Sequence, residues 1–318
     1  MSRVAVIGAG AVGCYYGARL AEAGHEVHFL MRRDYDAVAA GGLRIESVDG
    51  DLVLPHPHIA RSSEEIGPVD WVICALKATA IEETRALVAP CVGDTTRILL
   101  IMNGLGLEER FAEWFGAHRV FGGLAFTCIN RGEPGTVHHI DYGPVTIAHF
   151  EDDASEIASG MALWAGAKVK MLSALCLLAA RWMKLAWNIP FNGLTVTAGG
   201  VTTDRVLGMP GLREAAHAVM REVVAAGNAD LVAHGLVDRL DEAAIVTDLI
   251  GRTDVMAAYR PSTMVDFIEG LPMEVDAMFV EPLRRARALG IATPYLALIT
   301  AQMQSLDRLA RERGAEPT

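Results

Sequence analysis

Hydrophobic positions at the start of the chain follow a strand, helix, strand order. Residues 3–7 (RVAVI) form a short apolar run typical of a buried strand, and residues 11–24 have helical spacing. Residues 25–30 (HEVHFL) alternate between polar and apolar, which indicates a second strand. Strand, helix and strand within about 30 residues form a βαβ unit, so the pattern predicts a parallel sheet.

The predicted secondary structure changes from mixed to helical near residue 172. Before that point, the pattern predicts further strands at 71–76, 97–102, 120–127, 136–141, 144–150 and 168–172, and helices at 80–89, 107–115 and 154–167. After it, helical spacing dominates, at 174–188, 211–234, 241–250, 263–269 and 273–289. We therefore predict an α/β domain over residues 1–172 and an all-helical domain over residues 173–318.

Composition and charge exclude several classes of protein. The 318 residues are 52% hydrophobic, which predicts a globular chain with a large core. The net charge of −11 argues against a nucleic-acid partner. No apolar run is long enough to cross a bilayer, and the chain shows no signal-peptide layout, so we expect a cytoplasmic protein without a membrane partner. The five cysteines lack metal-ligand spacing, and no metal site is predicted.

A glycine loop connects the first strand to the first helix. Gly8, Gly10 and Gly13 have the G-x-G-x-x-G spacing in which the glycines allow a tight turn, a close approach to a pyrophosphate and close helix packing. Ala11 and Val12 open the helix, whose N-terminus favours an anion. The first domain is therefore predicted to be a Rossmann-type dinucleotide-binding domain.

The end of the second predicted strand bears on the choice of cofactor. NAD-binding folds usually place a carboxylate there, whereas this chain has Arg32 followed by Arg33. A guanidinium suits a 2′-phosphate, so NADP(H) is the predicted cofactor. Asp34 leaves NAD open, because its carboxylate could accept a hydrogen bond from a ribose 2′-OH.

Two further polar residues follow predicted strands, at the edge where open α/β sheets bind ligands. Lys77 could pair with a cofactor phosphate, and Asn103 could bind ribose or substrate. A solvated lysine at the start of a helix and a simple Asn-Gly turn are the alternatives.

Three polar residues interrupt an apolar stretch of the helical domain. Lys184 and Asn188 are four residues apart and share one helix face, and Asn192 continues that face if the helix does. Pro190 predicts a kink or break, which would turn Asn192 toward the side of Lys184. An enclosed lysine can act as a general acid, but a lysine that reaches solvent beside two capping asparagines is equally compatible with the pattern.

Acidic and hydroxyl residues that could complete a site lie further along the helical domain. Glu274 and Asp276 begin a predicted helix, where they could also serve as N-terminal charges. Ser262 is a candidate hydroxyl donor or, equally, a helix N-cap.

Together these residues resemble the ketopantoate reductase (2-dehydropantoate 2-reductase) family over nearly the whole chain. The resemblance rests on GAGAVG at 8–13, LKA at 76–78, NGLG at 103–106, KLAWNIPFNGL at 184–194, PST with Asp266, and EVD at 274–276. The family has a Rossmann domain, a helical domain and an active site between them. It reduces a branched 2-keto acid with NADPH in pantothenate biosynthesis.

The resemblance implies a role for each matching residue. Lys184 corresponds to the catalytic general acid and Glu274 to the acidic residue beside it. Asn188, Asn192 and Ser262 correspond to substrate-binding residues. Asn103 would contact cofactor and substrate, and Arg32 and Lys77 would bind the cofactor together with the glycine loop.

The expected activity is therefore the NADPH-dependent reduction of 2-dehydropantoate to (R)-pantoate. Thr263, Val265, Leu271 and Met273 depart from the family pattern beside Ser262 and Glu274, where they would reshape the substrate pocket. A D-2-hydroxy-acid dehydrogenase for other branched or aromatic 2-keto acids is thus an alternative, and a non-catalytic NADP(H)-binding sensor is another. A homodimer is a candidate assembly.

Overall fold

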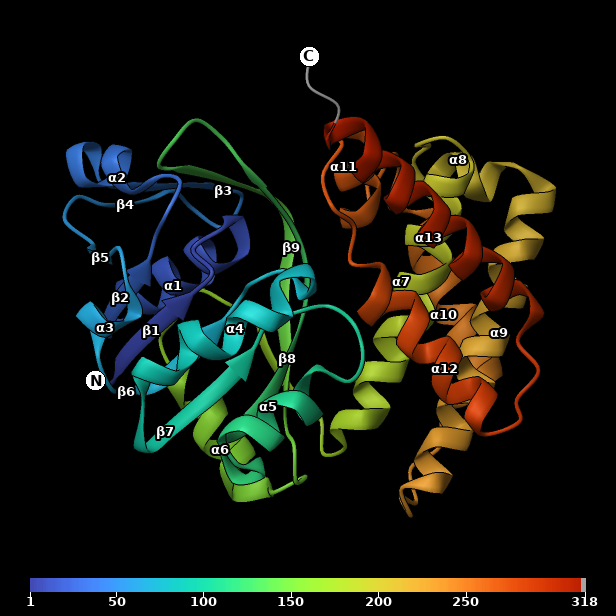
Figure 1. The fold of residues 1–318 in the computed structure, drawn as a ribbon, viewed down its shortest axis with the longest axis horizontal. Helices are drawn as coiled ribbons and strands as arrows, with labels where there is room; N and C mark the ends of the chain where they lie inside the picture. The colour runs from blue at the N-terminus through green and yellow to red at the C-terminus, as the bar shows by residue number, and fades with distance from the viewer. Residues whose placement is uncertain (316–318) are drawn as a thin grey trace. The chain divides into compact units, whose positions relative to one another are not determined.

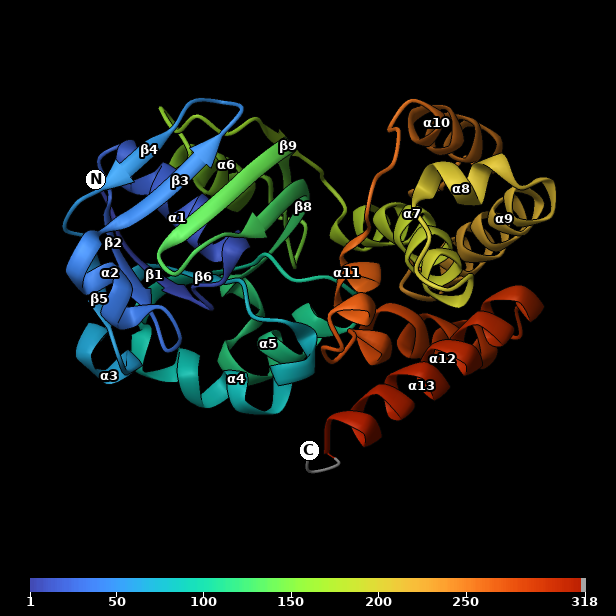
Figure 2. The same cartoon turned by 90° about the horizontal axis from the view of Figure 1, so that it is seen from above.

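The computed structural model describes residues 1–315, which divide into two compact units. The first unit comprises Met1–Met102 and Leu107–Leu177, and the second comprises Asn103–Gly106 and the chain from Leu178 onward. Figures 1 and 2 show a strand-rich first unit and a helical second unit. The predicted fold class, a Rossmann-type domain followed by an all-helical domain, is confirmed.

A single mixed sheet forms the centre of the first unit. Within the described residues it has ten strands in the order β4-β3-β9-β8-β7-β6-β1-β2-β5, with β10 paired to β9. The strands are β1 (Arg3–Ile7), β2 (Glu26–Leu30), β3 (Leu43–Ser47), β4 (Leu52–Leu54), β5 (His58–Ala60), β6 (Val69–Cys74), β7 (Val92–Leu100), β8 (Val120–Arg131), β9 (Thr136–His149) and β10 (Met171–Ser173).

Six neighbouring strands, from β5 through β2, β1, β6 and β7 to β8, are parallel. Read in chain order, they have the 3-2-1-4-5-6 arrangement of dinucleotide-binding folds. Strand β9 is antiparallel to β8, and β3 and β10 are parallel to β9. Because β10 pairs with this sheet, the first unit extends beyond the predicted boundary at residue 172, as far as Leu177.

Helices cover both faces of the sheet. They are α1 (Ala11–Glu22), α2 (Tyr35–Gly41), α3 (Ser63–Ile66), α4 (Ile81–Val88), α5 (Leu107–Phe115) and α6 (Ala154–Leu163), with short 3₁₀ turns η1 (Ala78–Ala80), η2 (Ala89–Cys91) and η3 (Ala117–Arg119). Figure 2 shows α1 and α6 on one side of the parallel strands and α3, α4 and α5 on the other.

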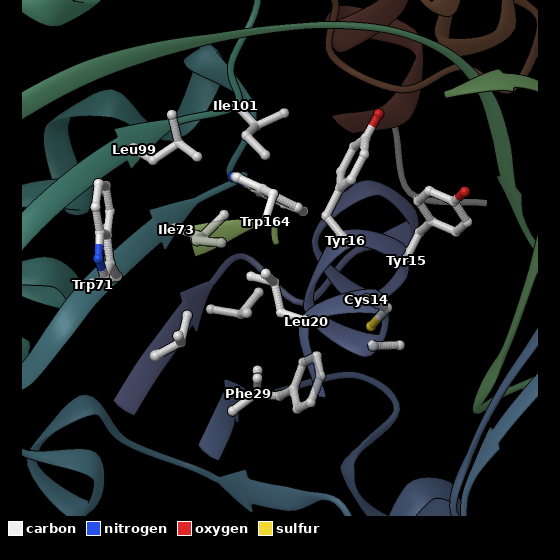
Figure 3. Close-up of a cluster of buried hydrophobic side chains, with 14 of the residues drawn as sticks. Cys14, Tyr15, Tyr16, Leu20, Phe29, Trp71, Ile73, Leu99, Ile101 and Trp164 are labelled. Carbon is white, nitrogen blue, oxygen red and sulfur yellow. The ribbon is translucent and has the colours of Figure 1, made fainter. Parts of the chain in front are cut away.

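The curled sheet encloses α1, which contacts β1, β2 and β6 as well as β3, β8 and β9. In Figure 3 its side chain Leu20 lies beside Phe29 of β2, while Tyr15 and Tyr16 extend from the helix away from Phe29. Gly17 permits this approach, because a Cβ there would lie 2.5 Å from the Phe29 ring. The buried Tyr16 hydroxyl donates to the Gly143 carbonyl at 3.1 Å. Close packing thus fixes the helix whose N-terminus follows the glycine loop.

The two strands predicted at 136–141 and 144–150 are one strand, β9, so the predicted interruption is wrong. The backbone at Tyr142 and Gly143 has positive φ angles of 61° and 126°, which are typical of turns. Strand β8 pairs with β9 on both sides of this irregularity and keeps the strand continuous.

The second unit is helical. Its elements are α7 (Leu177–Thr197), α8 (Thr203–Gly208), α9 (Pro210–Ala233), α10 (Glu242–Asp254), α11 (Ser262–Ile268), the π-helix η4 (Asp276–Val280), α12 (Glu281–Ala288) and α13 (Pro294–Ala315). In the part of the chain that the structure describes, no helix has the length and apolar character needed to cross a membrane.

Helix α7 runs through the core of this unit. Trp182 is fully buried, and its indole N–H donates to Asp230 of α9 at 2.9 Å. Arg285 of α12 donates to the same carboxylate at 3.1 Å, so a buried ion pair ties three helices together. The helix continues through Pro190, and the predicted break does not occur. Burial of its apolar faces offsets the backbone hydrogen bond that the proline removes.

Candidate functional site

The glycine loop has the geometry of a phosphate cradle. Gly8 has a φ of +99°, and a Cβ there would lie 2.6 Å from the Leu76 nitrogen. A Cβ on Gly13 would lie 2.3 Å from the Gly8 oxygen. At Gly10, by contrast, the nearest atom to a Cβ would be Nη2 of Arg131, at 3.6 Å. Turn and helix packing therefore require the outer glycines, while the middle one leaves its face open to an approaching group.

The first turn of α1 fits a dinucleotide phosphate. Gly10 is the N-cap residue, so no side chain caps the helix. The first turn contains no acidic residue. Ala11 and Val12 are partly buried and begin the helix. Their backbone N–H groups and the positive end of the helix dipole suit an anion, so the residues present fit the pyrophosphate of a dinucleotide.

Two arginines and one carboxylate follow β2. Arg32 and Arg33 are exposed, and Asp34 occupies the N-cap position of α2. Asp34 makes no capping hydrogen bond with its side chain. Its Oδ2 atom instead accepts a hydrogen bond from Nη1 of Arg131 at 2.9 Å. The carboxylate that left NAD open as a cofactor is therefore neutralised by Arg131, which belongs to no motif in the sequence.

Lys77 lies next to the glycine loop in the fold. The two residues before it, Ala75 and Leu76, pack directly against Gly8. Lys77 itself is exposed and precedes η1. Its predicted pairing with a cofactor phosphate stays a prediction that this placement favours.

The second unit contains the remaining candidate residues, all from three of its segments. Lys184 and Asn188 lie on α7, where Lys184 is partly buried and Asn188 is 6% exposed. Asn192 also lies on this uninterrupted helix and is 1% exposed. The i, i+4, i+8 spacing places the three side chains on one face of α7.

Asn192 connects α7 to the start of α11. Its side-chain oxygen accepts a hydrogen bond from the Thr263 N–H at 3.0 Å, and its nitrogen donates to the Asn188 carbonyl at 2.9 Å. Ser262 is exposed and is the first helical residue, and Pro261 is the N-cap residue. The alternative that Ser262 caps the helix is therefore wrong, and Asn192 has a positioning role that the sequence did not indicate.

Glu274 and Asn103 meet within the second unit. The Asn103 amide donates to the Glu274 carboxylate at 3.4 Å, and Glu274 is 6% exposed. The Leu105 N–H donates to the Ala277 carbonyl at 2.9 Å. Gly104 approaches Ala277 so closely that a Cβ would lie 2.4 Å from its Cβ. The loop from Asn103 to Gly106 is thus docked on the segment that carries Glu274 and is more than a simple turn.

Glu274 precedes a π-helix, η4, rather than the predicted α-helix. Such π-turns are rare and often occur at functional sites, because the wider turn moves neighbouring side chains out of α-helical positions. The sequence pattern of this segment does not distinguish a π-turn from an α-turn. Among the residues that the structure describes, no group of His, Cys, Asp or Glu side chains is arranged to hold a metal ion.

Comparisons with known proteins match both units. A family model described as ketopantoate reductase PanE/ApbA matches residues 4–152, and its C-terminal counterpart matches residues 177–307. A 2-dehydropantoate 2-reductase from Nostoc sp. is 34% identical over 313 residues, which cover 96% of this chain and 95% of that protein.

Solved structures agree with this match. A 2-dehydropantoate 2-reductase from Geobacter metallireducens superposes with a TM-score of 0.90 at 41% identity, covering 97% of this chain and 99% of that one. One from Methylococcus capsulatus has a TM-score of 0.86 at 31% identity and covers 99% and 98%. A D-mandelate dehydrogenase with NADH has a TM-score of 0.86 at 19% identity and covers 97% and 99%, a likeness of fold alone.

Proposed function

Because the chain belongs to the ketopantoate reductase family, we propose that it reduces 2-dehydropantoate to (R)-pantoate with NADPH. The observation that carries this proposal is the polar face of α7. Lys184, Asn188 and Asn192 lie on one side of an otherwise apolar, largely buried helix. The amine of Lys184 and the side-chain amide of Asn188 suit a small acid with a carbonyl and hydroxyl groups.

In the proposed reaction, bound NADPH supplies the hydride that reduces the keto carbon. Lys184 stabilises the negative charge that develops on the carbonyl oxygen and donates a proton to it. Its amine suits this task better than a guanidinium, which keeps its proton at all ordinary pH values. The chain has only four lysines, so a lysine in this apolar stretch is a specific choice.

Other residues hold the substrate in this proposal. Ser262 donates to the substrate carboxylate, and Asn188 donates to a substrate oxygen. Asn192 acts mainly through α11, because its two polar atoms already bind Thr263 and Asn188. Glu274 accepts from a substrate hydroxyl, in a position supported by Asn103.

Two departures from the family pattern lie in the core of the second unit. Thr263 and Met273 are each 1% exposed, and the Met273 N–H donates to Asp307 at 2.8 Å. These residues therefore contribute to packing, and their side chains have little surface to offer a ligand. This burial favours 2-dehydropantoate over a substrate that would require a reshaped pocket.

The test is NADPH oxidation with three substrates under equal conditions: 2-dehydropantoate, 2-ketoisovalerate and phenylglyoxylate. We expect the highest kcat/KM with 2-dehydropantoate. A preference for either of the other acids would replace the proposed substrate with that of a D-2-hydroxy-acid dehydrogenase. NADPH binding without oxidation of NADPH by any of the three would instead favour a sensor. A homodimer remains our proposed assembly, and sedimentation analysis would test it.

A further inference from the structure

The carboxyl end of β8 brings an arginine to the glycine loop. Strand β8 pairs with β7 from Val120 to Gly122. Beyond Gly122 it pairs with β9 alone, as far as Arg131. Since β8 is parallel to β1, this extension runs past the edge where the glycine loop lies. Next to it, β9 pairs with β3, which follows α2 in the chain.

The Arg131 guanidinium reaches two parts of the cofactor site. Nη1 donates to Asp34, after β2, while Nη2 faces the open side of Gly10. The thiol of Cys14, in the first turn of α1, is close enough for its pKa to respond to both charges. In folds of this type the pyrophosphate lies at the glycine loop and the ribose 2′ position at the end of the second strand. Arg131 therefore spans the interval between these two positions.

The ion pair replaces an interaction that Asp34 would ordinarily make. An aspartate at an N-cap position usually accepts a hydrogen bond from the first turn of its helix. Asp34 makes no such bond and is turned to Arg131 instead. Since 38% of the Arg131 side chain and 22% of the Asp34 side chain are exposed, the pair contributes little to stability. Its position beside the glycine loop points to a role in binding.

We propose that Arg131 is a cofactor-specificity residue that selects NADPH over NADH. It neutralises Asp34, which would otherwise repel a 2′-phosphate and accept a hydrogen bond from a 2′-OH. It also donates its remaining N–H groups to the 2′-phosphate, together with Arg32. The inference rests on the proposed use of NADPH and adds a residue from a distant part of the chain.

The test is to measure the binding of NADPH and NADH directly, with nucleotide fluorescence as the readout and no keto acid present. Arg131→Gln should raise the Kd for NADPH by about 10- to 100-fold, the effect expected for a lost charge-assisted hydrogen bond. The Kd for NADH should change by less than about threefold, since NADH lacks the 2′-phosphate. Arg131→Lys should give an intermediate value, because the ammonium keeps the charge without the fork of donors.

A second substitution separates neutralisation from direct contact. Adding Asp34→Asn to Arg131→Gln removes the repelling carboxylate and should recover at least about threefold of the lost NADPH affinity. Arg3→Gln is the matched control, because Arg3 pairs with Glu26 at the other end of β2 and its side chain is 34% exposed. It removes the same charge and should leave both Kd values within about twofold.

Equal weakening of NADPH and NADH binding by Arg131→Gln would overturn the specificity role, as would unchanged binding of both. Circular dichroism and thermal unfolding of each variant establish that the fold is retained. The outcome is separate from that of the proposed reaction. If NADPH binds and responds to Arg131→Gln but reduces no keto acid, the proposed function fails and this inference stands. If the variant oxidises NADPH with an unchanged preference, this inference alone fails.

Discussion

The side-chain amide of Asn103 donates to the carboxylate of Glu274 although 171 positions separate them in sequence. Asn103 lies in the loop after β7, and Glu274 precedes the π-helix η4. The Leu105–Ala277 backbone hydrogen bond supports the same contact. The loop and the proposed acidic residue are therefore one structural feature, and a change in either should affect the other.

A double-mutant cycle should measure this coupling. Asn103→Ala removes the donor, and Glu274→Gln removes the charge on the acceptor. We expect each substitution to lower kcat/KM and the pair to be non-additive by about 0.5–1.5 kcal/mol, the range for a single hydrogen bond. Steady-state kinetics of the four proteins with the preferred keto acid provide the measurement. Fully additive effects would show that the two residues act independently.

Docking of this loop depends on the absence of a side chain at Gly104. Gly104 has a φ of +110°, and a Cβ would lie 2.4 Å from the Ala277 Cβ and 2.8 Å from its carbonyl carbon. Gly104→Ala should lower the free energy of unfolding by about 2–4 kcal/mol, through backbone strain and displacement of the loop. Urea unfolding measures the change, and kcat/KM should fall as Asn103 moves away from Glu274.

A second glycine separates strain from collision. Gly24 has a φ of +93°, but nothing lies within 4 Å of the Cβ position. Gly24→Ala should therefore lower the free energy of unfolding by about 1 kcal/mol, from strain alone, and leave kcat/KM unchanged. If both substitutions destabilise the protein equally, contact with Ala277 contributes nothing and the docking argument fails.

The sequence could predict those features that local patterns encode. The glycine loop, α1 and the flanking strands follow from hydrophobic period and from three glycines at fixed spacing, and the structure has all of them. The same is true of the shared helix for Lys184 and Asn188, which are four residues apart. In these segments the role of each residue depends on neighbours only a few positions away along the chain.

Other features depend on contacts that no local pattern contains. Arg131 pairs with Asp34 across 97 positions, and only the curl of the sheet brings them together. Asn192 reaches Thr263 across 71 positions. Pro190 lies within a continuous helix because tertiary burial overrides its effect on the backbone. In each case the sequence shows the residue itself but does not show which distant residue it contacts.

Lys184 should be required for turnover and not for cofactor binding. Lys184→Ala should lower kcat by about 10²–10⁴-fold, the contribution of a positioned general acid, while the Kd for NADPH changes by less than about twofold. Lys184→Arg should be nearly as slow, because a guanidinium keeps the charge but gives up its proton poorly. Steady-state assays give kcat, and stopped-flow single turnovers of NADPH oxidation give the rate of the chemical step without interference from product release.

The matched control is Lys168→Ala, which removes the same group from an exposed lysine paired with Glu22. It should leave kcat unchanged. Full turnover of Lys184→Ala with the preferred keto acid would refute the proposed role of Lys184 as proton donor. Loss of NADPH binding in the same variant would assign Lys184 to the cofactor instead.

Buried thiols should make the protein less stable as the pH rises above 9. Burial raises the thiol pKa from 9.0 to about 12 in both Cys14 and Cys74, and to about 11 in Cys91. Between pH 9 and 11 the Cys14 and Cys74 thiols lose protons almost only in the unfolded chain, and Cys91 does so up to about pH 10. The unfolded chain therefore binds fewer protons than the folded one over this range. The free energy of unfolding should fall by about 1.4 kcal/mol per pH unit for each such thiol, and no such loss should occur below pH 8.

Cys74→Ala isolates the contribution of one thiol. Cys74 is fully buried on β6, so the substitution lowers stability at every pH by leaving a small cavity. Its distinguishing effect is on the slope of the unfolding free energy against pH. Between pH 9 and 11 this slope should become shallower by the amount that one proton contributes. Urea unfolding at half-unit pH intervals measures both quantities. Parallel curves for the two proteins over this range would mean that the Cys74 thiol ionises alike in the folded and unfolded states, and that burial does not hold its proton.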